Sequence, residues 1–271
     1  MKLFLNILLS FLLLTSIVYS QDNLLKSGNN LLKIGNNLIG IPFNQYSMLF
    51  DGVDESINTG TSSSLGQNDN DWTISAWIKT TSANHQHIYC EGKDLADNNL
   101  ISIRTDVNKA SLFVRNNAGG GSGTVIISST SNINDDAWHN IIGTKIGDLY
   151  SLYLDGVLEI SETKTLGNIP ILHTGIGALY RSTISNFFTG NIDEVSTWNK
   201  GLSLAEVEEL YNSGTPTKLS KHSANSNLLN WWRMGDRSTF DGTNFTLIDQ
   251  NSNVDGTSVN MEFSDKTISI P

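Results

Sequence analysis

Carboxylates are the side chains of this sequence with the clearest capacity for chemistry. The chain has 27 acidic and 17 basic residues, which gives a formal charge of −10 at pH 7. Carboxylate oxygens are hard ligands that suit Ca²⁺, and Asp51 and Asp54 place two of them around one Asp-Gly turn. Aspartate is also a good turn former in its own right, so the motif permits calcium binding or ordinary turn chemistry. The sequence contains no basic cluster, which argues against nucleic acid as a partner.

Side chains that could act as nucleophiles or zinc ligands are scattered. The chain has no Gly-x-Ser-x-Gly motif, and Cys90 is the only cysteine, so no intramolecular disulfide can form. The Ile-Tyr-Cys run predicts that Cys90 is a small buried residue. His85 and His87 could form half of a zinc site on one strand face. The sequence indicates no third ligand, so we interpret these two histidines as solvated loop residues. For His139, beside Trp138, we expect a packing or hydrogen-bonding role.

Aromatic side chains are the other groups that could recognise a ligand, because their faces stack on the apolar side of a sugar ring. Tyr180, Phe187 and Phe188 precede Gly190 in a loop-like segment, and we predict that these three bind ligand. Aromatic residues within strand-like runs are more typical of a core. The tryptophans of this second kind are Trp72, Trp77, Trp138 and Trp198.

The elements that carry these residues are mostly strands. The run 73–79 alternates, with Ile74, Ala76 and Ile78 on one face. Asp155-Gly156 lies between two apolar pairs, which predicts a two-residue hairpin turn with positive φ at both positions. Short strands at regular spacing indicate an antiparallel β-sandwich.

One short helix is expected near residues 203–214. Ser203 followed by Glu206 forms a capping box, and Leu204, Val207, Leu210 and Tyr211 then share one helical face. Gly214 supplies a left-handed stop. The preceding run 192–197 alternates like a strand.

Four segments in this order resemble laminin-G-like domains of the concanavalin A-like lectin/glucanase superfamily, over roughly residues 46–214. The segments are SMLFDGVDESINTG (47–60), DWTISAWIKT (71–80), DDAWHNIIGTKIGDLYSLYLDGVLEIS (135–161) and GNIDEVSTWNKGLSLAEVEELYNSG (190–214). The resemblance implies an all-β fold, a concanavalin A-like jelly-roll β-sandwich with one short C-terminal helix. It says little about function, because one fold hosts many activities.

The resemblance also bears on catalysis and on calcium. Laminarinase-type glucanases of the superfamily carry carboxylates at alternate positions of one strand, two of which act as nucleophile and acid/base. The matching positions here are Asn191, Asp193 and Val195, which predicts that the chain is not an enzyme of this type. In many domains of this fold Ca²⁺ ties the turn after the first strand to the last strand. That implies a structural calcium site formed by Asp51, Asp54 and Asp193.

The chain divides into four expected parts. Residues 1–20 have a lysine, an apolar run and a small residue before Gln21, as in a cleaved signal peptide. Residues 21–45 contain the repeats NLLKSGN, NLLKIGN and NLIG, which are typical of a linker. The laminin-G-like sandwich spans 46–217. Residues 218–271 resemble the start of another unit, and we favour their docking on the sandwich over a truncated repeat.

These observations favour a secreted or cell-surface, non-catalytic module that binds carbohydrate or another cell-surface ligand, as an adhesion module would. The alternative is a structural surface or virion-decoration protein without glycan specificity. Exposed aromatics in a groove would favour the first, and a broad apolar patch would favour the second.

Overall fold

The computed structural model describes residues 31–34, 37–40, 43–60, 65–93, 99–117, 123–251 and 253–271. The chain forms two compact units, Met1–Phe43 and Asn44–Pro271. Within the first, β1 (Leu31–Ile34) pairs antiparallel with β2 (Asn37–Gly40). The predicted signal peptide, residues 1–20, lies outside the described residues. Among the helices that are described, none is long and apolar enough to cross a membrane.

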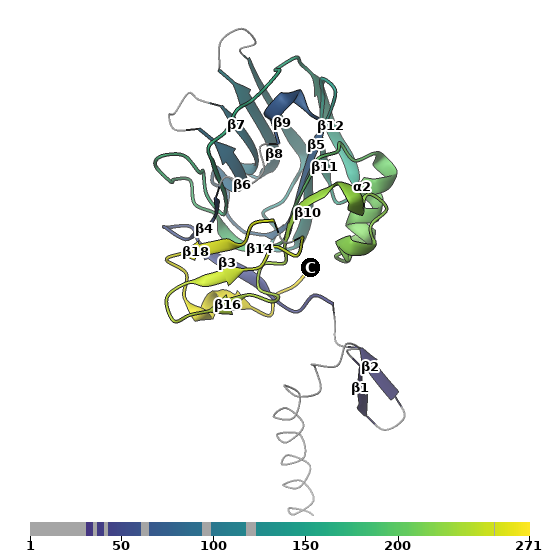
Figure 1. The fold of residues 1–271 in the computed structure, drawn as a ribbon, viewed down its shortest axis with the longest axis vertical. Helices are drawn as coiled ribbons and strands as arrows, with labels where there is room; N and C mark the ends of the chain where they lie inside the picture. Colours follow the sequence, from purple (N-terminus) through teal and green to yellow (C-terminus); the bar gives the residue numbers. More distant parts are fainter. Residues whose placement is uncertain are drawn as a thin grey trace, which may run out of the picture. The chain divides into compact units, whose positions relative to one another are not determined.

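The second unit is built from two antiparallel sheets (Figure 1). Sheet 1 contains, in spatial order, β12 (Val157–Thr163), β11 (Leu149–Leu154), β10 (Trp138–Ile146), β5 (Trp72–Lys79), β14 (Thr189–Trp198), β3 (Ser47–Asp51) and β19 (Lys266–Thr267). An eighth strand, β15 (Leu228–Trp232), pairs with β14 beyond the end of β3. This antiparallel sandwich confirms the predicted fold class.

Sheet 2 has nine strands. In spatial order they are β16 (Thr239–Phe240), β17 (Phe245–Leu247), β18 (Gly256–Val259), β4 (Ser56–Gly60), β13 (His173–Ile176), β6 (Gln86–Gly92), β7 (Leu100–Asp106), β8 (Lys109–Asn116) and β9 (Gly123–Asn132). The short 3₁₀ turns are η1 (Gln67–Asp69), η2 (Asn212–Gly214), η3 (Leu219–Lys221), η4 (Asn225–Asn227) and η5 (Phe263–Asp265).

Alternating side chains of each sheet fill the space between the two sheets. In β5 the predicted inward residues Ile74, Ala76 and Ile78 are fully buried in the core. They meet inward residues of sheet 2, such as Ile103 and Leu112. Burial of each large apolar side chain contributes about 1.5–3 kcal/mol, so this core is what holds the two sheets together.

Residues 218–271 supply strands to both sheets. β15 and β19 extend sheet 1 through β14 and β3, while β16, β17 and β18 extend sheet 2 through β4. These are the yellow-green and yellow strands beside β3 and β4 in Figure 1. Trp231 and Trp232 are both buried. The C-terminal segment is therefore part of the same compact unit as the preceding strands.

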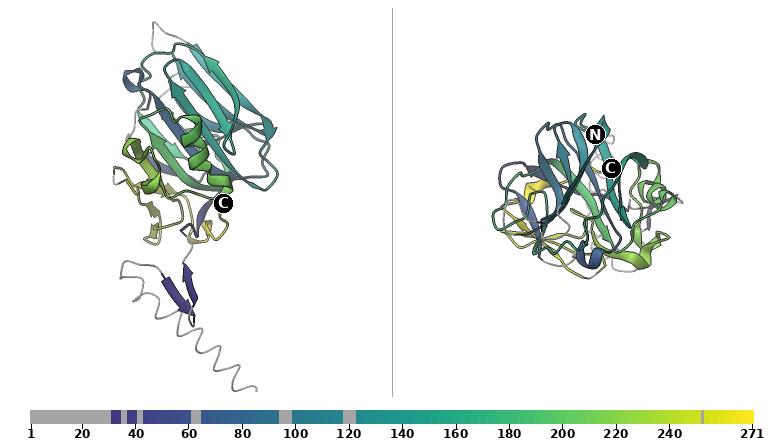
Figure 2. Two further views of the ribbon diagram at one scale, coloured as in Figure 1. Left: turned by 90° about the vertical axis from the view of Figure 1, so that its right-hand side faces the viewer. Right: turned by 90° about the horizontal axis from the view of Figure 1, so that it is seen from above.

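A single α-helix in the described chain, α2 (Leu204–Tyr211), lies against sheet 1 (Figure 2). The predicted capping box is present: Glu206 N–H donates to Ser203 Oγ, and Ser203 N–H donates to the Glu206 carboxylate. The Tyr211 ring stacks on Trp77 with centroids 5.6 Å apart. The predicted helix stop was wrong, because Asn212, at φ 48°, takes the left-handed position before Gly214.

Candidate functional site

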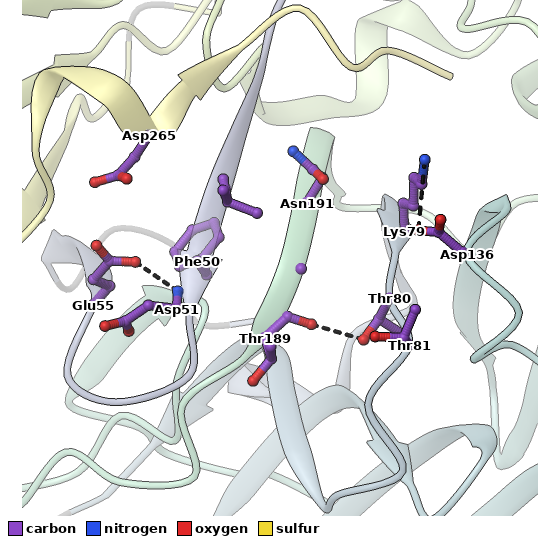
Figure 3. Close-up of a pocket in the computed structure, with 12 residues that line it drawn as sticks. Phe50, Asp51, Glu55, Lys79, Thr80, Thr81, Asp136, Thr189, Asn191 and Asp265 are labelled. Carbon is purple, nitrogen blue, oxygen red and sulfur yellow. Dashed lines mark hydrogen bonds and ion pairs between the residues drawn. The ribbon is translucent and has the colours of Figure 1, made fainter.

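A pocket of about 350 Å³ lies where β3, β14 and β5 run side by side (Figure 3). Its volume falls at the lower end of the roughly 300–1,000 Å³ range of small-ligand sites. The lining residues are Leu49, Phe50, Asp51, Glu55, Lys79, Thr80, Thr81, Asp136, Thr189, Gly190, Asn191 and Asp265. Hydroxyl, amide, carboxylate and ammonium groups thus surround a small apolar area.

Gly190 forms the wall of this pocket where β14 passes close to β5. Its φ is 128°, and a Cβ at this position would lie 2.2 Å from the carbonyl oxygen of Lys79. The adjacent Thr189 is fixed from two sides. Thr80 Oγ1 donates to the Thr189 carbonyl at 2.7 Å, and Gln86 Nε2 donates to Thr189 Oγ1 at 2.9 Å. This part of the wall is therefore preorganised and free of bulky side chains.

One end of the pocket is acidic. Glu55 is 6% exposed, and its carboxylate accepts the Asp51 N–H at 2.6 Å. Burial raises the pKa of Glu55 to about 7, and repulsion from Asp265 and Asp51 adds to the shift, while the Asp51 N–H opposes it. Asp51 Oδ1 accepts the Val53 N–H at 2.8 Å, which is the turn chemistry that the sequence allowed.

An ion pair marks the other end of the pocket. Lys79 Nζ lies 3.5 Å from Asp136 Oδ1, and both side chains reach solvent. The Asp136 N–H donates to the Thr80 carbonyl, which anchors the acid beside β5. Both ends of the pocket therefore carry groups that can accept or donate hydrogen bonds to a ligand with several hydroxyl groups.

The structure separates the three predicted calcium ligands. Asp51 lies opposite Thr189, and Asp193 is four residues further along β14, which corresponds to about 13 Å along the strand. Asp54 belongs to the turn after β3 and lines no wall of the pocket. Calcium ligands lie at about 2.3–2.6 Å from the ion, and the described residues contain no group of three acidic, histidine or cysteine side chains arranged for a metal. Calcium binding by this set stays a prediction without geometric support.

A β-bulge explains where Asp193 points. Asp193 pairs with Trp77, but the next pair on the same side is Ser196 with Ser75. Glu194 takes the left-handed backbone conformation, with φ 47°, and Val195 turns into the core. The expected alternation of Asp193 and Val195 on one face is therefore wrong, since Ser196 occupies that slot. Because Asn191 and Ser196 flank Asp193, the face still lacks the carboxylate pair of a glucanase.

The two acids at the bulge are buried. Asp193 Oδ2 accepts a hydrogen bond from Asn44 Nδ2 at 2.6 Å. Glu194 accepts one from Trp231 Nε1 and forms an ion pair with Arg233 at 3.2 Å. Burial, followed by repulsion from Glu194, raises the pKa of Asp193, and burial raises that of Glu194 to about 7 despite Arg233. These carboxyls are taken up by contacts with Asn44, Trp231 and Arg233, and their burial closes them to a large ligand.

The predicted stacking residues are largely unavailable to a sugar. Tyr180 is 3% exposed and donates from its hydroxyl to Ser56 Oγ, while Phe188 is fully buried and meets Phe50 edge-on. Phe187 is partly buried against the cluster that contains Tyr180. Gly175 makes the burial of Tyr180 possible, because a Cβ at position 175 would lie 2.2 Å from the Tyr180 ring. This contact between distant residues cannot be read from the sequence, which is why Tyr180 was predicted to be available to a ligand.

Histidines and the cysteine take structural positions. His87 is buried with Nδ1 2.7 Å from Ser102 Oγ, so its assignment to a solvated loop was wrong. His139 bridges Asp155 and Asp135, as a hydrogen-bonding role predicts. Cys90 is fully buried, and burial raises the pKa of its thiol to about 12, which opposes formation of a thiolate.

Several pocket residues had no signal in the sequence. Lys79 ends a strand, Asp136 sits in the loop before Trp138, and Asp265 comes from the C-terminal segment. They meet only because β5, β10 and β19 belong to one sheet. Gly190 offered the one local hint, since glycine inside a strand pattern often marks a close backbone approach.

Comparison with known proteins gives a family and a fold. A family model described as the concanavalin A-like lectin/glucanases superfamily matches residues 51–208. No curated protein matches the chain. A proposed carbohydrate-binding protein from Bacteroides ovatus has a similar structure, with a TM-score of 0.59 at 14% identity over 82% of this chain. The match covers 60% of that protein, so this chain spans only part of its length.

Two further structures show weaker similarity. The CBM40 module of a Ruminococcus gnavus sialidase, bound to α2,3 sialyllactose, has a TM-score of 0.49 at 17% identity, over 62% of this chain and 98% of the module. Domains LG4-5 of the mouse laminin α1 chain give 0.46 at 14% identity, over 66% and 48%. The family model covers more than half of the sequence, and the two facing antiparallel sheets agree with it. The chain belongs to the concanavalin A-like lectin/glucanases superfamily.

Proposed function

We propose that this protein is a non-catalytic carbohydrate-binding module that acts outside the cell or at its surface. The observation that carries the proposal is the pocket between β3, β14 and β5, with polar groups at both ends and a glycine wall between them. Thr81, Asn191 and Asp51 offer hydroxyl, amide and carboxylate groups within one small volume. Sugars present several hydroxyl groups on one ring, and small-ligand sites fix such groups through a few convergent polar side chains.

Family membership and the B. ovatus structure support the same function. That protein is described as a carbohydrate binder, and it shares this fold. The face of Asp193 lacks a catalytic carboxylate pair, which supports a binding role over hydrolysis. Extracellular location is inferred from the signal-like residues 1–20.

A glycan array with neutral and charged glycans tests the proposal. We expect selective binding by the wild-type protein. Lys79→Ala and Asp136→Ala should each weaken it about tenfold, because each removes a charged hydrogen-bonding group from the pocket. Lys218→Ala is the matched control, since Lys218 is exposed and does not line the pocket. An array without selective binding would contradict the proposed function. Wild-type binding by both pocket variants would place the site elsewhere.

A further inference from the structure

Strands β7, β8 and β9 present a second face that the pocket does not include. Ile101, Ile103, Leu112 and Val114 point into the core, so the alternate residues of the same strands face away from it. Cross-strand pairing aligns Ser102, Phe113 and Ile126 in one row, and Leu100, Arg115 and Thr124 in the next. Ser102 is buried, and Leu100 and Phe113 are buried in a cluster that also contains Leu179 and Tyr180. The part of this face that reaches solvent is its margin, with Arg115, Thr124 and Ile126. We call this surface, with Arg104 and Arg181, the arginine face.

Phe113 brings two arginines together at the centre of the arginine face. The guanidinium carbon of Arg104 lies 4.4 Å from the centre of the Phe113 ring, and that of Arg115 lies 5.4 Å from it. Cation–π contacts of this kind hold a planar guanidinium in one orientation. The side chain of Arg104 is only 7% exposed, and Asp106 Oδ2 accepts from it at 3.2 Å.

A third arginine reaches the same surface from the loop after β13. The Arg181 Cγ lies 3.4 Å from the place where a Cβ on Gly92 would stand. Gly92 pairs with Leu100, which in turn pairs with Arg115. The positive charges of Arg104 and Arg181 also both act on buried His87, whose pKa falls mainly through burial. Three of the five arginines of a chain with charge −10 therefore converge on one face.

Two donors on this face lack protein acceptors. The Nε atoms of Arg104 and Arg181 are buried, and neither has a hydrogen-bond partner among the described residues. Both Nε atoms are out of contact with solvent, so a ligand would meet the terminal nitrogens of a guanidinium and not these atoms. A guanidinium held by packing is suited to bidentate recognition of a carboxylate or a sulfate.

The surroundings favour a sugar as the carrier of that anion. Ile126 is 50% exposed beside Phe113, and the hydroxyl-bearing Thr124 and Ser128 are half-buried on the same strand face. A sugar ring offers both hydroxyl groups and an apolar side to such a surface. A long polyanion would meet the acidic remainder of the molecule, whereas one acidic residue of a glycan would not.

We propose that the arginine face binds an acidic sugar residue, through a carboxylate or a sulfate held by Arg115 and Arg181 with Arg104 behind them. The proposal rests on the proposed carbohydrate-binding function and adds a second subsite with a stated ligand class. Arg104 contributes its fixed positive charge, while half-buried Arg115 and Arg181 reach solvent.

Isothermal titration of the whole chain tests this with matched ligands. The α-1,4-linked trisaccharide of galacturonic acid is compared with the corresponding galactose trisaccharide, which differs only in lacking carboxylates, and with its 6-O-sulfated form. We expect an acidic form to bind at least about tenfold more tightly than the neutral one, because each charge-assisted hydrogen bond contributes on this scale. Binding should weaken as salt rises, because exposed charges are screened. The two acidic ligands distinguish carboxylate from sulfate recognition.

Variants assign the effect to the arginine face. Arg115→Gln and Arg181→Gln should each reduce affinity for the acidic ligand about tenfold and leave the thermal midpoint close to wild type. Arg237→Gln removes one exposed charge elsewhere and should change nothing. Equal affinity for acidic and neutral trisaccharides, or affinity unchanged in both variants, would overturn the proposal. Equally tight binding of a triglutamate peptide would overturn the assignment to a sugar. If the acidic-sugar proposal fails in one of these ways but the protein still binds neutral glycans selectively, the proposed carbohydrate-binding function is retained.

Discussion

Asp193 shows how a single residue can be chemically conspicuous and still be structural. Its carboxyl group is fully buried beside Glu194. The Arg233 guanidinium forms an ion pair with Glu194, the other acid of the pair. Burial and mutual repulsion favour the protonated acids in the folded state. The pair therefore carries a stability cost at neutral pH that is absent in acid.

We expect Asp193→Asn to stabilise the fold near pH 7. A raised pKa means that the folded state binds protons more tightly than the unfolded state, so the contribution of Asp193 to stability is complete below its unfolded value near 3.8 and is lost as the pH rises through the raised folded value. The neutral amide should avoid this loss and raise the free energy of unfolding by about 1–3 kcal/mol at pH 7. Urea denaturation at pH 4.5 and pH 7 measures it. A variant that is less stable than wild type at both values would contradict the burial argument.

At the scale of elements, helix α2 begins at the Ser203–Glu206 capping box that the sequence predicts. Ser203 Oγ accepts the Glu206 N–H, and Glu206 in turn accepts the Ser203 N–H and pairs with Lys200. Val207 and Leu210 are buried against sheet 1. Cap and apolar face together fix how the helix lies on the sheet.

Ser203→Ala should lower the free energy of unfolding by about 1 kcal/mol, because an orphan N–H of the first turn loses its acceptor. Ser203→Gly should cost only a few tenths of that amount. Chemical denaturation of both variants measures the difference, with Ser226→Ala as the control, because Ser226 is an exposed serine in the short turn η4. If Ser203→Ala is as stable as the control, the capping box contributes nothing measurable.

The whole molecule is stabilised by strands that are far apart in sequence. β15 continues the edge of β14 beyond β3, and β18 completes the edge of β4. The C-terminal segment also delivers Trp232, Phe245 and Leu247 to the common core.

A chain that ends at Thr217 should not fold cooperatively. Each buried side chain of this size contributes about 1.5–3 kcal/mol, so several of them together match the whole stability of a typical domain, roughly 5–15 kcal/mol. Circular dichroism and thermal unfolding measure the outcome. A cooperative transition near the wild-type midpoint would show that residues 44–217 are an independent domain.

The sequence by itself determined features that depend on neighbours along the chain. Three local predictions match the structure: the alternation of 73–79, the Asp155-Gly156 turn with φ of 51° and 76°, and the Ser203 capping box. Each rests on backbone geometry or hydrogen bonds within a few residues, which is the range over which sequence patterns report. Family motifs added the order of strands and hence the fold class.

Only the tertiary structure decided which side chains meet. Asp51 and Asp193 lie on the same sheet yet about four residues apart in register, and the bulge at Glu194 shifts the following residues by one position. Tyr180 is buried because Gly175, on another strand, leaves room for its ring. Lys79, Asp136 and Asp265 share a pocket only through strand pairing. Register, bulges and packing across sheets are set by non-local contacts, and these leave no periodic trace in one sequence.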